Sequence, residues 1–160
     1  MPRLNLHKIF LIILSALFFT LPAFAASIMV ERVIDGDTLK LSDGRKIRLI
    51  GVDTPETVHP FKPVECYGKE ASNFTKREIE GKLVLVVPDD LNNYKDKYGR
   101  DLAYIYRASD MFFLNMKLVS RGYARAYIRF PFTKKDEFIL AEKYAKDHDL
   151  GLWKECKADK

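Results

Sequence analysis

The 160-residue sequence has only two cysteines and three histidines, and it lacks internal repeats, low-complexity tracts and linkers. Two cysteines this far apart in the chain argue against a cysteine-based metal site. Neither His59, in a proline-bounded loop, nor His148, on a predicted helix face, is favoured as a catalyst. Without repeats or linkers, the chain is expected to form one domain around one core.

Acidic residues are outnumbered, with 22 Asp and Glu against 27 Lys and Arg, which gives a formal net charge of +5. A basic protein favours a polyanionic partner over an acidic-surface role. Because many small secreted proteins are also basic, the charge alone does not select a function.

The longest apolar run lies at the N-terminus and is short for a membrane span. It follows the basic residues Arg3 and Lys8 and is broken by Pro22, ahead of a small-residue site that ends at Ala25. This is the pattern of a secretory signal over residues 1–25, with an uncleaved anchor as the alternative. Residues 26–160 would then form the mature domain, in a periplasm or outside the cell. No cysteine lies near the predicted cleavage site, so a lipid-anchored form is not expected.

Both cysteines remain in the mature chain, and an oxidising compartment favours a disulfide between Cys66 and Cys156 over two free thiols. It would close a loop of about 90 residues, for which the chain-entropy model gives on the order of 4–5 kcal/mol. We expect it to tie the C-terminal tail to the start of the first helix.

Short β-type segments alternate with turns in the first half of the mature chain. Strands are predicted over residues 27–33, 38–41, 46–52, 82–87 and 102–106. A helix is predicted over about 67–80, with Ala71, Phe74 and Ile79 facing inward and Gly81 ending it.

Two further helices are predicted in the second half. Asn115 is the expected N-cap of a short helix that Gly122 ends. The last helix is expected to open at Thr133, with Asp136 completing a capping box, and to end at Gly151. Its predicted inward stripe is Leu140, Ala141, Tyr144, Ala145 and His148. Five strands and three helices predict an α+β protein whose strands curl into a small barrel.

Three separated segments place acids and arginines at predicted strand ends: VIDGDT (33–38), RLIGVDTPE (48–56) and DKYGR (96–100). Each alone is an ordinary turn or a local ion pair. Burying an arginine with carboxylates is costly unless a metal or a phosphate joins them. Together, in this order and spacing, the three segments are far more specific than any one of them.

The chain from Val33 to Trp153 resembles the staphylococcal nuclease (thermonuclease) family through these three motifs, the segment 65–75 (ECYGKEASNFT) and the residues around Leu118 to Ala124. The resemblance implies a five-stranded OB-fold barrel with three helices. It also implies calcium-dependent hydrolysis of DNA and RNA that leaves 3′-phosphates and 5′-hydroxyls. Aromatic residues interleaved with cations near the proposed groove predict little sequence specificity and a preference for single strands. Nothing in the sequence demands an oligomer.

By motif position, the resemblance implies that the carboxylates of Asp37 and Asp53 and the carbonyl of Thr54 bind calcium. Their hard oxygen donors suit Ca²⁺ without excluding magnesium or manganese. Glu56 matches the acid near the attacking water, as a general base or as a group that only orients the water. Arg48 and Arg100 match the phosphate clamps, where a planar guanidinium can bind two oxygens at once.

Substrate contacts are expected from Lys97 and Tyr98, which match positions near a terminal phosphate, and from Tyr127. Tyr123 and Tyr127 are alternatively core residues. Arg129 stands where the family has a second tyrosine, so it would stack a base or hold a phosphate instead.

Two other interpretations are a binding module that has lost its chemistry and a secreted protein with a purely structural calcium site. A degenerate module should lack members of the acid and arginine set, and all five are present in this sequence. A structural calcium site leaves the two arginines without a role.

Overall fold

The structure is a computed structural model that describes residues 26–57, 63–91 and 95–156. The predicted export signal over 1–25 and the loop residue His59 therefore lie outside the described residues. Within the described ranges, no helix is long and apolar enough to cross a membrane.

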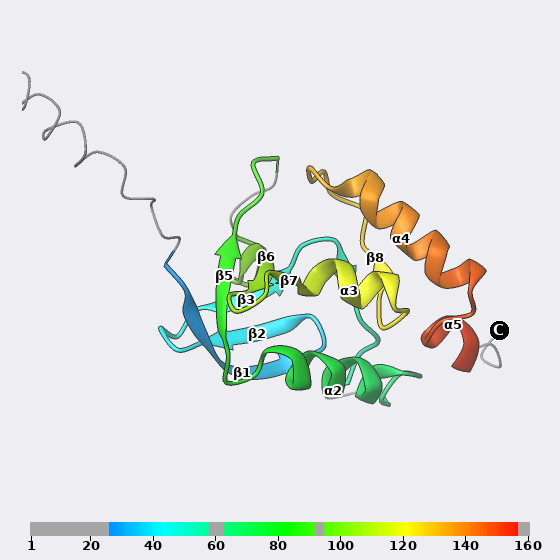
Figure 1. Ribbon diagram of the computed structural model, residues 1–160, viewed down its shortest axis with the longest axis horizontal. Helices are drawn as coiled ribbons and strands as arrows, with labels where there is room; N and C mark the ends of the chain where they lie inside the picture. Colours follow the sequence, from blue (N-terminus) through cyan, green and yellow to red (C-terminus); the bar gives the residue numbers. More distant parts are fainter. Residues whose placement is uncertain (1–25, 58–62, 92–94, 157–160) are drawn as a thin grey trace, which may run out of the picture.

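Five strands form a closed barrel, seen at the left of Figure 1: β1 (Ile28–Asp35), β2 (Thr38–Leu41), β3 (Lys46–Leu49), β5 (Leu83–Val87) and β6 (Asp101–Arg107). Antiparallel neighbours run in the order β3-β2-β1-β5-β6. A parallel pairing of β3 with β6, in which Arg48 lies opposite Leu102, closes the ring. The short strand β7 (Phe112–Phe113) pairs with the end of β6. The predicted α+β barrel class is confirmed.

The predicted strand over 46–52 is two strands, because the chain turns at Gly51. Strand β3 ends at Leu49, and β4 (Val52–Asp53) pairs instead with β8 (Arg125–Ala126), outside the barrel sheet. Gly51 has a φ of 73°, and a Cβ there would lie 2.8 Å from the Phe138 ring. Only glycine combines that left-handed backbone with such a close approach. The turn carries Asp53 away from the barrel wall.

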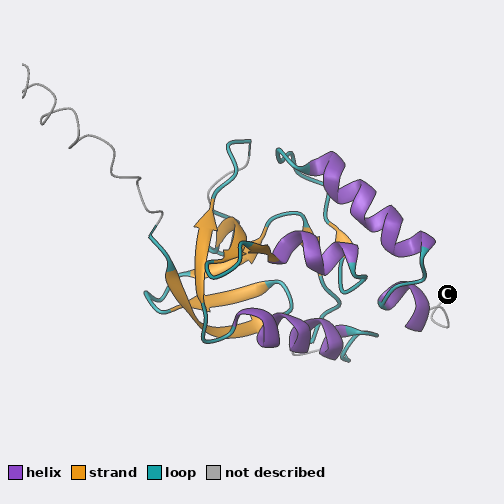
Figure 2. Ribbon diagram, viewed as in Figure 1, coloured by secondary structure: helices purple, strands orange, loops and turns teal. Residues whose placement is uncertain are grey.

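Four helices are present among the described residues (Figure 2), one more than predicted: α2 (Gly68–Ile79), α3 (Leu114–Ser120), α4 (Lys135–Asp147) and the single turn α5 (Leu152–Glu155). Helix α2 buries Ala71, Phe74 and Ile79 as predicted. Gly81 follows it at a φ of 71° and Gly122 follows α3 at 74°. Helix α3 lies between the barrel and α4, so α4 and α5 occupy the end of the molecule opposite the strands (Figure 1).

The prediction that Asn115 caps a helix is wrong, because α3 already begins at Leu114 and Asn115 is fully buried. Its amide donates to the carbonyls of Ile50 (2.9 Å) and Ala103 (3.2 Å), and its Oδ1 accepts from the N–H of Ile105 at 2.9 Å. Asn115 therefore satisfies backbone groups where β3 leaves the barrel.

Helix α4 differs from its prediction at its start, its end and its face. It ends at Asp147, and Gly151 instead precedes α5. It begins at Lys135 without a side-chain cap, so Thr133 and Asp136 form no capping box. The buried residues are Phe138, Ala141 and Ala145, whereas Leu140 and Tyr144 are 65% and 53% exposed. His148 is also exposed and stacks on Tyr144. Phe138 shifts the inward stripe because it fills the space against Gly51 and Phe132.

A disulfide joins Cys66, just before α2, to Cys156, just after α5. Its two half-cystines are 90 positions apart. The bridge thus connects the C-terminal end of the described chain to the approach to the first helix, the place expected from the sequence.

Asp89 connects the barrel to the beginning of α4. The carboxylate is 4% exposed and accepts hydrogen bonds from the Tyr104 hydroxyl (2.6 Å), the Thr133 N–H (2.8 Å), the Leu91 N–H (2.9 Å) and the Thr133 hydroxyl. Burial raises the pKa of Asp89, but the hydrogen bonds from Thr133, Tyr104 and Leu91 bring it below its ordinary value. The Thr133 hydroxyl therefore donates to Asp89 and does not cap α4.

We expect Asp89→Asn to lower the free energy of unfolding by about 2–3 kcal/mol at neutral pH, because hydrogen bonds to a charged acceptor become neutral ones. Urea unfolding measures the change, and Asp90→Asn at the exposed neighbour is the control. The folded-state pKa of Asp89 is depressed, so its contribution is present above the unfolded pKa and is lost as pH falls through the folded pKa. A difference between the proteins that failed to shrink in acid would contradict this account.

Candidate functional site

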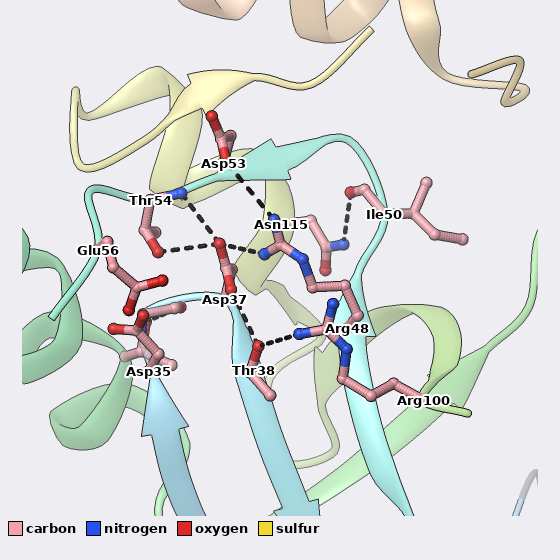
Figure 3. Close-up of polar contacts among 12 residues, drawn as sticks. Asp35, Asp37, Thr38, Arg48, Ile50, Asp53, Thr54, Glu56, Arg100 and Asn115 are labelled. Carbon is pink, nitrogen blue, oxygen red and sulfur yellow. Dashed lines mark hydrogen bonds and ion pairs between the residues drawn. The ribbon is translucent and has the colours of Figure 1, made fainter. Parts of the chain in front are cut away.

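A polar pocket of about 570 Å³ opens at one end of the barrel. It is lined by side chains from all three predicted motifs, among them Asp35, Asp37, Arg48, Asp53, Glu56 and Arg100. These come from the β1–β2 turn, from β3 and β4 and the chain after them, and from the turn before β6. The tertiary structure therefore brings the acid and arginine set into one cleft (Figure 3).

Asp37 holds the β1–β2 turn against the chain that follows β4. Its Oδ2 accepts from the N–H and the hydroxyl of Thr54, each at 3.0 Å, and its Oδ1 accepts from the Thr38 hydroxyl at 3.0 Å. A Cβ at Gly36 would lie 2.8 Å from the Thr54 Cγ2. Glycine at this turn lets Thr54 approach closely enough to reach Asp37.

Arg48 points from β3 into the pocket, and its side chain is only 17% exposed. Its Nη1 contacts the Asp37 carboxylate, and its Nη2 lies 3.6 Å from Asp53 Oδ1 (Figure 3). Burial, followed by the nearby Arg100 guanidinium, lowers the pKa of Arg48, while Asp53 and Asp35 act in the opposite direction. Two cations and several carboxylates thus share a small, partly desolvated volume.

Arg100 is oriented by the turn that precedes β6. Its Nε donates to Asp96 Oδ2 at 2.7 Å, and its Nη1 donates to the Thr38 hydroxyl at 3.1 Å. Although burial raises the pKa of Asp96, donors from Arg100 and Tyr98 lower it below its ordinary value. Asp96 therefore stays ionised and holds the Arg100 side chain through its Nε, while the guanidinium lines the pocket.

Glu56 and Asp35 form a carboxylate pair beside the Asp37–Thr54 contact. Glu56 Oε1 accepts from the Thr57 N–H at 3.0 Å, and Asp35 Oδ1 accepts from the Thr57 hydroxyl at 2.6 Å. Burial raises the pKa of Asp35, and the hydrogen bond and charge of Glu56 raise it further. A carboxyl that binds protons more readily beside Glu56 relieves repulsion between the two acids.

The predicted metal ligands line the same pocket, and the Arg48 guanidinium lies between Asp37 and Asp53 (Figure 3). Among the described residues, no group of three or more Asp, Glu, His or Cys side chains is arranged to hold a metal ion. Asp37, in the β1–β2 turn, and Asp53, in β4, provide carboxylates, and Thr54 directly after β4 would add its backbone carbonyl. Asp53 is 48% exposed and lies 3.6 Å from the Arg48 guanidinium, so its oxygens are open to a cation. Asp37 already receives the Thr54 N–H, the Thr54 hydroxyl, the Thr38 hydroxyl and the Arg48 guanidinium, so a cation would replace part of these contacts. Such an all-oxygen set, in an open polar pocket with space for water, fits a hard divalent cation.

Only one of the four predicted substrate-binding residues lines the pocket. Tyr98 lines the pocket, is 71% exposed and lies between Lys97 and Arg100, whose cationic groups are 5.0 and 5.4 Å from its ring centroid. Tyr127 is close enough to affect the pKa of Arg48, but neither it nor Lys97 nor Arg129 belongs to the pocket wall.

Tyr123 is half-buried, packs against the core and stacks on Phe74 at 4.2 Å between ring centroids, which favours the alternative that it is a packing residue.

Three residues that support the site were not predicted as site residues: Asp35, Asp96 and Asn115. Asp35 shares a turn with Asp37, and the spacing of Asp96 four residues before Arg100 was a usable signal for an ion pair in the turn. The role of Asn115 had no local signal, because its partners Ile50 and Ala103 are distant in sequence.

The family model for staphylococcal nuclease homologues matches residues 46–155. The chain is 46% identical over 132 residues to a thermonuclease of Staphylococcus intermedius, which covers 79% of this chain and 76% of the relative. It is 47% identical over 128 residues to a thermonuclease of Staphylococcus hyicus, covering 78% and 73% of the two chains. An endonuclease of Bacillus subtilis, YncB, is 41% identical over 133 residues, 79% of this chain and 61% of that protein.

The matched residues of the family model run from the start of β3 to α5, and they include Arg48, Asp53, Glu56 and Arg100 of the pocket. The relatives carry nuclease names. The pocket of arginines and carboxylates agrees with hydrolysis of a phosphodiester in nucleic acid. The chain therefore belongs to the staphylococcal nuclease family and is a nuclease.

Proposed function

We propose that this nuclease uses a calcium ion to cleave DNA and RNA with little sequence specificity, prefers single strands, and leaves 3′-phosphate and 5′-hydroxyl ends. We further propose that it acts as an exported monomer, in a periplasm or outside the cell, after removal of residues 1–25. The observation that carries the activity is the convergence of Arg48 and Arg100 on a pocket that also contains Asp37, Asp53 and Glu56.

Asp37, Asp53 and the Thr54 carbonyl would hold the ion, which would neutralise charge on the phosphate and orient it. Arg48 and Arg100 would bind the nonbridging phosphate oxygens, and their hydrogen bonds strengthen as charge develops there in the transition state. Asp96 and Thr38 hold the Arg100 fork in place before substrate arrives. This preorganisation reduces the rearrangement that the reaction requires.

Glu56 would accept a proton from a water molecule that attacks phosphorus, as the bond to the 5′-oxygen breaks. Its carboxylate lies in the pocket with both arginines. The 5′-oxygen would take a proton from solvent and leave as a hydroxyl, and the phosphate would stay on the 3′ side.

The preference for single strands rests on the exposed ring of Tyr98 beside the pocket, with Lys97 and Arg100 next to it. An exposed aromatic ring can stack on any base, so it tolerates many sequences but needs an unpaired base. Tyr127 and Arg129 lie farther along the chain after β8 and would contact the neighbouring nucleotide.

Digestion of single-stranded DNA with calcium, with magnesium or with a chelator tests the proposed ion and products. We expect cleavage with calcium, much less with magnesium and none with chelator, because the carboxylates lose the cation that neutralises the phosphate. End-group analysis should find 3′-phosphates. Unchanged digestion in chelator would refute metal dependence, and 5′-phosphate ends would refute the assigned leaving group.

Replacing Glu56 by Gln should lower kcat about 100-fold or more while calcium affinity stays near that of the wild type, because the amide cannot accept the proton and the ion is held elsewhere. Steady-state kinetics and calorimetric calcium titration measure the two properties. Glu70→Gln, at an exposed position in the first turn of α2, is the matched control. Full activity in the Glu56 variant would eliminate this residue as the base.

Asp96→Asn should reduce kcat about tenfold through loss of the charged support under Arg100, since small misplacements of a catalytic group are costly. The amide keeps the Oδ1 acceptor that binds two backbone N–H groups of the turn, so the melting temperature should change little. Asp101→Asn, whose partners Lys95 and Arg45 are outside the pocket, serves as control. If both variants show equal kcat, Asp96 does not position Arg100.

A further inference from the structure

The main chain of Glu56 is held by Glu65, a residue to which neither the sequence nor the proposed mechanism gives a role. The Glu65 N–H donates to the Glu56 carbonyl at 2.9 Å, and Glu65 Oε2 accepts from the Glu56 N–H at 3.2 Å. Each of the two residues therefore donates one hydrogen bond to the other, although they are nine positions apart in the sequence. A reciprocal pair of this kind fixes both the position and the orientation of the peptide units on either side of Glu56.

A second contact restrains the same chain. A Cβ at Gly68, the first residue of α2, would lie 2.8 Å from Thr57 Cγ2, 3.1 Å from the Pro55 carbonyl and 3.2 Å from the Glu56 carbonyl. The Glu56 segment is therefore packed directly on the start of α2. The Gly68 N–H donates to the Glu65 carbonyl at 3.0 Å, so Glu65 and α2 form one support.

The disulfide anchors this support to the far end of the molecule. Cys66 follows Glu65 directly and is bonded to Cys156 at the end of α5. Helix α5 is itself fixed, because Leu152 is 2% exposed and its N–H donates to the Gly122 carbonyl at 2.8 Å. A Cβ at Gly151 would lie 2.2 Å from that carbonyl, so the two segments touch through their backbones.

Glu65 and Cys66 are exposed. Glu65 lines the arginine and carboxylate pocket, and it also lines a second pocket of about 830 Å³ whose wall includes both half-cystines and Trp153. Solvent therefore reaches the disulfide from this second pocket, close to the proposed base.

We propose that Glu65, anchored by the Cys66–Cys156 disulfide, is a positioning residue for Glu56, and that the disulfide makes turnover dependent on redox conditions. The inference rests on the proposed role of Glu56. A dithiol opens the bridge by thiolate attack on one sulfur and then closes to its own cyclic disulfide. It gives up two electrons and two protons, which appear as the thiols of Cys66 and Cys156. The opened bridge frees Glu65, and Glu56 loses its fixed placement.

The test uses the full chain with single-stranded DNA and saturating calcium, and it compares kcat and KM with and without dithiothreitol. We expect reduction to lower kcat about tenfold with KM unchanged, because the support of a catalytic group is lost while phosphate binding by the arginines is kept. The double variant Cys66→Ser/Cys156→Ser should resemble the reduced protein and should not respond to dithiothreitol. That variant controls for effects of the reagent on calcium or on DNA.

Variants of Glu65 test the positioning of Glu56 while the disulfide stays intact. Glu65→Ala removes the acceptor for the Glu56 N–H and should lower kcat as reduction does, whereas Glu65→Gln keeps an acceptor oxygen and should retain most of the activity. Glu70→Ala is the matched control on α2. Because Glu65 is exposed, these variants are informative even where the bridge-free chain melts early. Near-UV circular dichroism and melting curves show that each protein is folded under assay conditions.

Combining Glu65→Ala with Glu56→Gln separates this inference from the proposed mechanism. If Glu65 acts through Glu56, the double variant has the same kcat as Glu56→Gln alone. Unchanged kcat in Glu65→Ala, or in the folded, reduced wild-type chain, overturns the inference and leaves Glu56 as the base. Full activity of Glu56→Gln overturns the base assignment instead, whatever Glu65 does.

Discussion

The contact between the Arg48 guanidinium and the Asp37 carboxylate is the interaction on which the arrangement of the site depends. Both side chains are largely buried, at 17% and 9% exposure, so neither charge can be left without the other. Removing water from the two groups costs several kcal/mol for each ion, and their attraction offsets this only in a well-built geometry. The Thr54 N–H, the Thr54 hydroxyl and the Thr38 hydroxyl supply the remaining hydrogen bonds to Asp37. The result is a site whose charges are held in place before any ligand binds.

The barrel determines that these charges meet. Arg48 is in the middle of β3, and the parallel pairing of β3 with β6 brings the turn that carries Arg100 to the same end of the barrel. The antiparallel pairing of β2 with β3 places Thr38 opposite Arg48, within reach of Arg100. Three hydrogen-bonded strands therefore hold two guanidinium groups and the Asp37 turn on a rigid frame. A frame of this kind suits a reaction that depends mainly on electrostatic stabilisation of a phosphate.

The acid side of the site is built differently. Asp53 and Glu56 lie on chain that has left the barrel after Gly51, and this chain is held by β8, by the start of α2 and by Glu65. Its supports are few and partly exposed, in contrast with the buried strands under the arginines. A nuclease that must admit a polynucleotide and release two products needs one side of its cleft to be less tightly packed. The disulfide at Cys66 ties this side of the cleft to the end of α5.

The sequence alone determined the chemistry and most of the local elements. Its three motifs contained the residue types of the site, and the positions of β2, α2 and the glycines after α2 and α3 followed from periodicity and turn preferences. These features depend on neighbours a few residues apart, so they can be predicted from a short stretch of chain. Resemblance to a known family supplied the roles, which spacing by itself did not.

Only the tertiary structure decided how these parts meet. The break at Gly51 depends on the ring of Phe138, and Asn115 is buried because Ile50, Ala103 and Ile105 converge on it. The outward placement of Leu140 and Tyr144 follows from Phe138 taking the inward position on α4. Each outcome depends on residues distant in sequence, because burial of a polar group or an aromatic ring is settled by the elements that surround it. The proximity of the four charged site residues also depends on residues distant in sequence, because closure of the barrel brings together Asp37, Arg48, Asp53 and Arg100.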